Sequence, residues 1–222
     1  MSIDIGTALA GIVFGLALAV PPGPMNAIIA EESVSRGWYA GLLAGFGAML
    51  ADVIFFFMAV LGAATIFDIV DRLEVVLFLL GGVLMLVFAV DALSTSMRTT
   101  TFTDAEVSVS ATGFQKTLVL GLTNPFQIAF WLTIGLTIVR SGELDIASYI
   151  PFISEFIVTT GSLSLIGGFF LGIVVWIAAY PAALVAIGDR FDAFAPVVAL
   201  LSGIVLLGFG LLFCWIAVNA MF

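Results

Sequence analysis

Six long apolar stretches alternate with short polar connections along the chain. They predict helices at about 5–34, 38–67, 73–93, 115–139, 160–187 and 195–220. Each is long enough to cross the hydrocarbon core of a bilayer, which takes about 20 helical residues. Because they use most of the 222 residues, we expect one all-α membrane domain, 1–222, with six transmembrane helices and no soluble catalytic domain.

A polar linker at 94–113, rich in Ser and Thr, separates the first three predicted helices from the last three. Each half then holds an odd number of helices, so the halves would run in opposite directions, and we predict a 3+3 inverted repeat. The segment 140–161 is too short and too polar at its ends to span, so we expect it at the membrane interface.

The basic residues predict the orientation of the chain. Cytoplasmic connections carry an excess of Lys and Arg. The second and fourth connections hold Arg72 and Arg140, whereas the odd-numbered connections hold Arg36, Arg98, Lys116 and Arg190. This distribution favours cytoplasmic odd-numbered connections, with both termini outside.

Composition and charge indicate the environment of the protein and disfavour some kinds of site. Apolar residues make up 63% and charged residues 9% of the chain, against averages of roughly 45–50% and about 25% for soluble domains. The net charge of −9 with a single lysine suits a salty environment, where charges are screened. We expect the cell membrane of a prokaryote, and we hypothesise a salt-adapted one; growth of the source only in low salt would refute that hypothesis. One cysteine and no histidine disfavour thiol relays and transition-metal sites, so we expect no cofactor, metal or nucleic-acid partner.

The first predicted helix is interrupted by "PPGPMN", residues 21–26. A proline inside a helix removes a hydrogen bond and clashes with a carbonyl one turn back, at a cost of about 3 kcal/mol. In lipid, such a break persists only where it is buried in protein or lines an aqueous cavity, as in transporters. Pro22, Gly23, Pro24 and Asn26 are therefore candidate substrate-binding residues, and a simple packing kink is the alternative.

The fourth predicted helix carries a second break, "TNPFQ", in which Asn124 precedes Pro125. The Asn124 side chain can bond a backbone group that the proline leaves open. Each break lies roughly 5–9 Å from the middle of its helix at 1.5 Å per residue. Because the first and fourth spans are antiparallel, both offsets point to the same side of the membrane. Asn124 and Pro125 are thus candidates for the same site.

Acidic and aromatic residues add further candidates. Asp52 lies near the centre of the second predicted helix, with no charged residue within fifteen positions on either side. A carboxylate at the bilayer centre costs about 2.5–3.5 kcal/mol, so Asp52 should face the interior and meet water, a proton, sodium or a substrate ammonium group. The alternative is a protonated Asp52 that bonds a neighbouring helix. Tyr180 could line a cavity or belong to an interfacial aromatic belt, and we expect Glu31 and Glu32 to end the first span at the interface.

These motifs together resemble the LysE/RhtB family of amino-acid exporters. The resemblance rests on "PPGPMN", on "SRGWYAGLLAGFGAMLAD" followed by Gly62 ten residues later, and on "TNP". It implies that Pro22, Gly23 and Pro24 form the family's PGP signature, that Asp52 is its membrane-embedded acid, and that Asn124 with Pro125 is its Asn-Pro signature. Two positions depart from the pattern: Phe126 stands where the family usually has lysine, and Ala51 where it usually has glycine.

The resemblance implies a secondary active transporter that exports amino acids or similar small zwitterionic metabolites, driven by a proton or cation gradient. The coupling ion could be a proton or sodium. Two alternatives stay open. An exporter of divalent metals or other small solutes would need several grouped oxygen ligands for a metal. A non-transporting membrane partner would use the glycines and breaks for subunit packing. We expect no enzyme, because the spans lack a nucleophile paired with a base. Homo-oligomerisation is left open.

Overall fold

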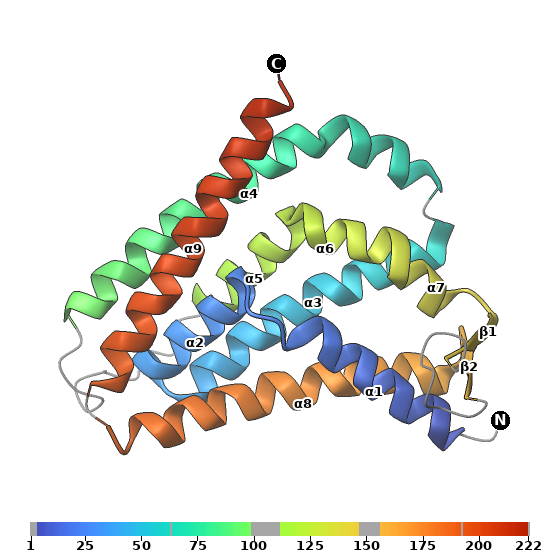
Figure 1. Cartoon of the computed structure of the whole chain (residues 1–222), viewed down its shortest axis with the longest axis horizontal. Coiled ribbons are helices and arrows are strands. Elements are labelled where there is room, and N and C mark those ends of the chain that lie inside the picture. The colour runs from blue at the N-terminus through green and yellow to red at the C-terminus, as the bar shows by residue number, and fades with distance from the viewer. Residues whose placement is uncertain (1–3, 63, 99–111, 147–155, 192, 222) are drawn as a thin grey trace.

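The computed structural model describes residues 4–62, 64–98, 112–146, 156–191 and 193–221 (Figure 1). Its helices in the first half of the chain are α1 (Ile5–Ala19), α2 (Pro24–Arg36), α3 (Trp38–Gly62) and α4 (Ala64–Arg98). The second half contains α5 (Thr112–Thr123), α6 (Pro125–Phe130), the π-helix η1 (Trp131–Gly135), α7 (Leu136–Val139), α8 (Leu163–Gly188) and α9 (Phe194–Asn219). Two short strands, β1 (Gly142–Asp145) and β2 (Ile157–Thr160), lie between α7 and α8.

Within the described residues, four stretches are single helices long and apolar enough to span a membrane: Trp38–Leu61, Val75–Ser94, Leu163–Gly188 and Phe194–Asn219. Two further spans are bent pairs. Ile5–Ala19 meets Pro24–Arg36 at 82°, and Gly113–Thr123 meets Pro125–Val139 at 59°. Counting each pair as one span gives six, and the bends fall at the predicted first and fourth helices. The all-α membrane fold with these two broken helices is confirmed.

One connection differs from the prediction, and a second contains strands that were not predicted. The predicted boundary at 68–72 lies inside a helix, because α3 ends at Gly62 and α4 runs from Ala64 to Arg98. Charged residues without Gly or Pro are compatible with helix, so α4 continues past its apolar part. The segment 140–161 contains an antiparallel hairpin in which Gly142 pairs with Thr160 and Asp145 with Ile157. Residues 147–155 of that segment, and 99–111 of the polar linker, lie outside the described residues.

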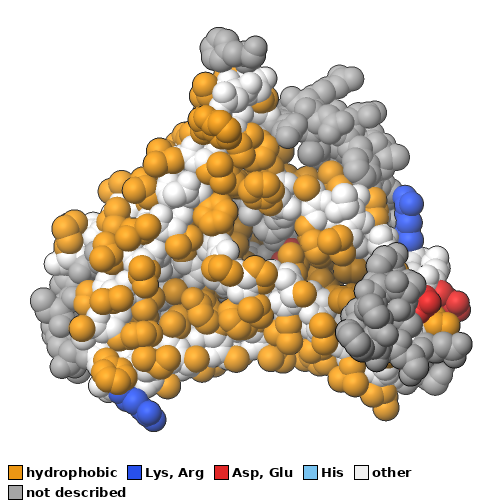
Figure 2. Space-filling model, in the orientation of Figure 1, with side chains coloured by type: hydrophobic (Ala, Val, Ile, Leu, Met, Phe, Trp, Pro, Cys, Tyr) orange, Lys and Arg blue, Asp and Glu red, His pale blue; other side chains and the backbone are white. Residues whose placement is uncertain are grey.

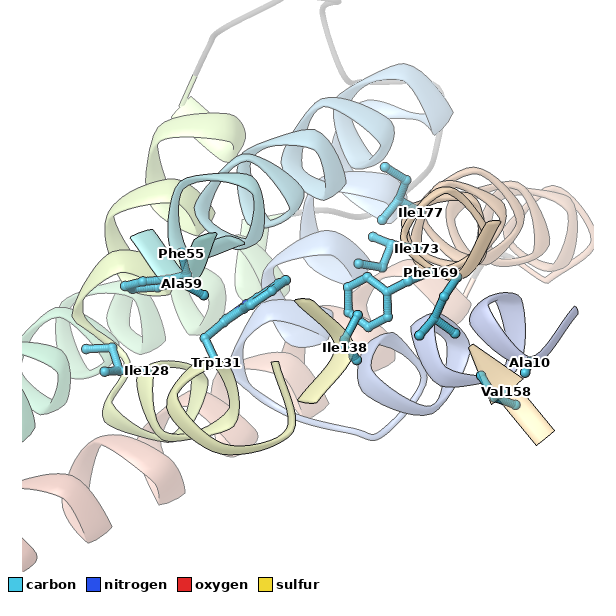
Figure 3. Close-up of a cluster of buried hydrophobic side chains, with 11 residues drawn as sticks. Ala10, Phe55, Ala59, Ile128, Trp131, Ile138, Val158, Phe169, Ile173 and Ile177 are labelled. Atoms are coloured by element: carbon cyan, nitrogen blue, oxygen red, sulfur yellow. The ribbon is translucent and has the colours of Figure 1, made fainter. Parts of the chain in front are cut away.

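Two hydrophobic clusters hold the helices together. One joins α1, α3, η1 and α8, and Figure 3 shows Phe55 and Ala59 of α3 beside Trp131, with Phe169 of α8 near Ile138. The other joins α2, α4, α5 and α9 around Met85, Leu120 and Phe213. The burial of these side chains fixes the helices that carry the two breaks.

Glycines allow α1 and α8 to approach closely. A Cβ on Gly168 of α8 would clash with the carbonyl oxygen of Ala8, and Gly15 of α1 faces the backbone of Phe169 in the same way. Small residues spaced four apart permit such contacts between membrane helices. The position of the end of α1, where the first break begins, therefore depends on these glycines.

The helix contacts agree with the predicted repeat without proving it. Helix α1 packs along α8, α5 packs along α3, and α4 packs along α9. An inverted repeat would exchange α1 with α5, α3 with α8, and α4 with α9. Under this exchange the α1–α8 contact corresponds to the α5–α3 contact, and the α4–α9 contact corresponds to itself. The 3+3 repeat stays a prediction.

Candidate functional site

Both helix breaks line one cavity of about 280 Å³, which we call the central cavity. Helices α3, α8 and α9 supply the rest of its wall. On the face seen in Figure 2, an apolar surface is hollowed in the middle, with acidic side-chain atoms at the bottom of the hollow. The structure brings six of the eight candidate residues to this cavity: Pro22, Gly23, Pro24, Asn26, Asp52 and Asn124.

The remaining two candidates lie close by. Pro125 is buried as the first residue of α6 and does not line the cavity. Tyr180 lines a neighbouring cavity of about 270 Å³, which also touches Pro22, Gly23 and Asn26. Its ring stacks on Trp176 with centroids 4.8 Å apart, and Trp176 lines both cavities. Tyr180 therefore touches the wall of the central cavity through Trp176.

At the first break, Asn26 bonds the carbonyl groups that the prolines leave open. Its Nδ2 donates to the carbonyl oxygen of Ala19 at 2.7 Å and to that of Pro21 at 2.9 Å. Its Oδ1 accepts from Trp176 Nε1 at 3.0 Å. The side chain thus replaces the missing helical hydrogen bonds and ties the break to α8.

The same break leaves donors unused at the start of α2. The first N–H groups of a helix have no partner within it. Ala27 N–H bonds Gly23 O, but the structure gives the N–H groups of Met25 and Asn26 no acceptor among the described residues. Both residues line the cavity. The amino end of a helix of 13 residues, with its partial positive charge, therefore faces this space.

At the second break, Asn124 caps α6. Its Oδ1 accepts from Phe126 N–H at 3.1 Å, and its carbonyl oxygen accepts from Gln127 N–H and Ile128 N–H at 3.1 Å each. The prediction that Asn124 bonds an open backbone group is confirmed. Because the cap uses these amides, this break offers the cavity the Gln127 side chain rather than free N–H groups.

Asp52 faces the interior, as predicted, and is 6% exposed. Its Oδ1 accepts two hydrogen bonds of 2.8 Å, from Gln127 Nε2 and Trp131 Nε1. Its Oδ2 takes no hydrogen bond from the described residues, and no Lys or Arg is among the residues that line the cavity. The carboxylate is thus anchored through one oxygen, which leaves the other for a ligand.

Gln127, Trp131 and Trp176 are site residues that the sequence analysis did not single out. Gln127 carried a usable signal, since it is a polar residue one turn after Asn124 in an apolar helix. Trp131 begins the π-helix η1, a wide turn that often occurs at functional sites, and its indole lies against Gly135. A larger residue at 135 would displace the indole from Asp52.

Glu31 and Glu32, which we expected to end the first span at the interface, lie inside α2 and are buried. Glu32 is 1% and Glu31 5% exposed. Both face Lys116 of α5: its Nζ lies 3.3 Å from Glu32 Oε1 and 3.8 Å from Glu31 Oε2. A lysine far away in the sequence compensates their charge, which explains why they can be buried.

Comparison with known proteins places the chain in a family. Residues 16–217 match the family model of the LysE type translocator. The chain belongs to this family. The matched range includes both breaks, Asp52 and Tyr180, and it confirms the resemblance inferred from the motifs.

Individual relatives of this LysE family member match it over part of its length. The leucine efflux protein of Salmonella typhimurium is 30% identical over 129 residues, which cover 57% of this chain and 59% of the relative. The provisionally named amino acid efflux protein YcgF of Bacillus subtilis is 28% identical over 130 residues, which cover 57% of this chain and 60% of the relative. An uncharacterized membrane protein of Pseudomonas aeruginosa, PA4757, is 28% identical over 144 residues, which cover 63% of this chain and 65% of the relative. The matches thus span less than two thirds of each relative, and no solved structure matches significantly.

Proposed function

We propose that this protein is a secondary active transporter that exports amino acids or similar small zwitterionic metabolites across a prokaryotic cell membrane. The observation that carries the proposal is the cavity in which two helix breaks meet beside a lone acid, Asp52. Membership of the LysE family supports it. So do the names of two relatives, a leucine efflux protein and an amino acid efflux protein.

The two charged ends of a zwitterion have complementary groups in the cavity. Asp52 Oδ2 is the acceptor for the substrate ammonium group, while Oδ1 is held by Gln127 and Trp131. The N–H groups of Met25 and Asn26, at the start of α2, are the donors for the substrate carboxylate. This assignment uses the helix-terminus interaction that discontinuous helices provide in transporters.

The rest of the cavity wall suits an uncharged, apolar side chain. Met49, Phe130, Ile173 and Phe209 line it, and no basic side chain does so. Phe126 also lines the cavity, with its ring against Phe213 at 5.3 Å between centroids. An acidic substrate side chain would enter this space without a positive partner, which is costly in a low-dielectric site. We therefore expect neutral amino acids such as leucine to be preferred over glutamate.

In this proposal a proton or cation gradient drives export, and Asp52 binds the coupling ion and the substrate ammonium group alternately. Rocking of the two three-helix halves would expose the cavity to one side of the membrane and then to the other. Among the described residues, no group of three or more acids or cysteines could hold a metal ion, so nothing there favours the divalent-metal alternative.

Gradient-driven transport of labelled leucine in proteoliposomes tests the proposal. Wild-type protein should move leucine uphill when a proton or sodium gradient is imposed, and Asp52→Asn should not. Asp189→Asn, at the exposed end of α8, is the matched control and should transport normally. Equal uphill transport by wild type and Asp52→Asn would remove Asp52 from the mechanism. No flux of any amino acid, together with a stable complex with another membrane protein, would favour the non-transporting partner.

A further inference from the structure

Five charged side chains gather where α2 ends, beside the last turns of α4 and the first turns of α5. Lys116 Nζ of α5 lies 2.6 Å from Asp91 Oδ2 of α4 and 3.3 Å from Glu32 Oε1 of α2. Glu31 Oε2 lies 3.8 Å from the same nitrogen, and Arg36 Nη1 lies 3.0 Å from Glu32 Oε2. Lys116 therefore joins two helices of the first half of the chain to a helix of the second half. We call these five residues the ionic cluster.

The ionic cluster runs from the interior to the surface. The side chains of Glu32 and Lys116 are 1% and 13% exposed, whereas that of Asp91 is 51% exposed. Removing one partner of a buried ion pair leaves an uncompensated charge, which is strongly unfavourable. The three helices can therefore separate here only if water enters between them.

The ionic cluster lies just beyond the central cavity. Ile29 of α2 lines the cavity, and Glu32 follows three residues later, about 4.5 Å along the helix axis. The helices around it are closely packed: Thr117 Oγ1 donates to Ala44 O at 2.6 Å, and Gly47 faces the backbone of Phe114. The space between α3 and α5 beside the ionic cluster is thus filled.

The opposite direction is open. A second cavity, of about 490 Å³, shares Leu18, Pro21 and Phe130 with the central cavity. It reaches Leu144 and Thr160 of the β-hairpin. Space therefore continues from the central cavity toward the hairpin face. In the other direction, the cavity lined by Tyr180 follows α2 only as far as Ala30, just before the ionic cluster.

We propose that the ionic cluster is the gate that closes the transport path at the face where α2 ends, and that it separates whenever the cavity opens to that face. Rocking of the two halves must part Lys116 from Glu32 and Asp91, because these pairs cross the boundary between the halves. As a step of a transport cycle, the gate rests on the proposed function. Access to the cavity can nevertheless be measured without any substrate.

A cysteine in the cavity wall serves as the reporter. Ala48 of α3 lines the central cavity, and replacing Cys214, the one natural cysteine, with Ala removes background reaction. The double variant Ala48→Cys, Cys214→Ala is reconstituted into vesicles. A membrane-impermeant thiol reagent is then applied separately to the α2-end face and to the hairpin face. The rate of labelling from each face reports how often the cavity opens there.

Asp91→Asn in this background removes the 2.6 Å charge contact at the exposed end of the cluster, where the fold should tolerate it. Because Asp91 is half-exposed and water screens its contact with Lys116, we expect labelling from the α2-end face to become about three- to fivefold faster. Labelling from the hairpin face should not accelerate. Lys116→Arg, which keeps the charge, and Arg190→Gln, which changes an exposed arginine after α8, should label within about twofold of the parent.

Two outcomes would overturn the gate. One is unchanged labelling of Asp91→Asn and Lys116→Met from the α2-end face. The other is equal acceleration from both faces, which would mean a loosened fold. If Lys116→Met does not elute as a monodisperse protein, Asp91→Asn decides alone. Should the wild type transport no amino acid while Asp91→Asn still opens one face selectively, the proposed function fails and the gate stands.

Discussion

Adjacent glycines in α8 allow a sharp test of how α1 is positioned. A Cβ at Gly168 would lie 3.0 Å from the carbonyl carbon of Ala8 and 3.2 Å from its Cα, and closer still to its oxygen. At Gly167, one residue earlier, a Cβ would meet nothing within 4 Å. Gly167→Ala and Gly168→Ala thus make the same chemical change on two sides of one helix.

The expected effects have opposite signs. Alanine inside a helix is favoured over glycine by about 0.5–1 kcal/mol, and Gly167→Ala should be stabilised by this amount. Gly168→Ala gains the same term but must push α1 away from α8, and overpacking costs about 1–3 kcal/mol. The net change should therefore be a destabilisation of up to about 2 kcal/mol. Since Leu18 and Ala19 of α1 line the cavity, leucine transport should fall too.

Thermal unfolding of both variants in detergent, followed by circular dichroism, measures this difference. The midpoint of Gly168→Ala should lie below that of the wild type, and the midpoint of Gly167→Ala at or above it. Midpoints that move together, in either direction, would refute the close α1–α8 contact.

Two further predictions concern the cavity wall. Trp131→Phe keeps the ring among Phe56, Phe169 and Phe170 but removes one donor to Asp52, so the unfolding free energy should fall by about 1–3 kcal/mol and leucine transport should slow; an unchanged thermal midpoint and rate would contradict the assigned bond. Phe126→Lys supplies the basic group that the cavity lacks, so glutamate should compete with leucine about tenfold better than in the wild type; a competition assay in which glutamate stays inert would refute the role of Phe126 in selectivity.

The two breaks could be predicted because their cause is local. Proline cannot continue a helix that precedes it without losing a hydrogen bond, and Asn124 caps the helix that begins one residue later. A lone acid in an apolar helix similarly had to face inward. The all-α membrane fold and the broken first and fourth spans followed from these local rules.

Other features depend on contacts between distant segments. The bond from Trp131 to Asp52 joins residues 79 positions apart and requires the wide turn of η1. The burial of Glu32 was missed because its partner, Lys116, lies 84 positions away in the sequence. The contact from Asn26 to Trp176 likewise requires α8 to pack beside the first break. None of these pairings leaves a periodic signal in the sequence.

The β-hairpin and the α3–α4 boundary were missed for a different reason. Ile157, Val158 and Thr159 are β-branched and favour a strand, but the run is too short to distinguish from an interfacial segment. At 68–72 the charged residues indicated a connection, although a helix that leaves the apolar layer tolerates such residues. Polarity there marked the end of the membrane core rather than the end of the helix.

Equilibrium binding of labelled leucine to the purified protein tests the central claim most directly. The wild type should bind leucine saturably. Asp52→Asn should bind it roughly 10- to 100-fold more weakly, because it loses a charged hydrogen bond of about 1.5–3 kcal/mol to the ammonium group. Asp189→Asn should bind like the wild type. Equal leucine affinity in the wild type and in a folded Asp52→Asn variant would contradict a substrate site at the meeting point of the two breaks.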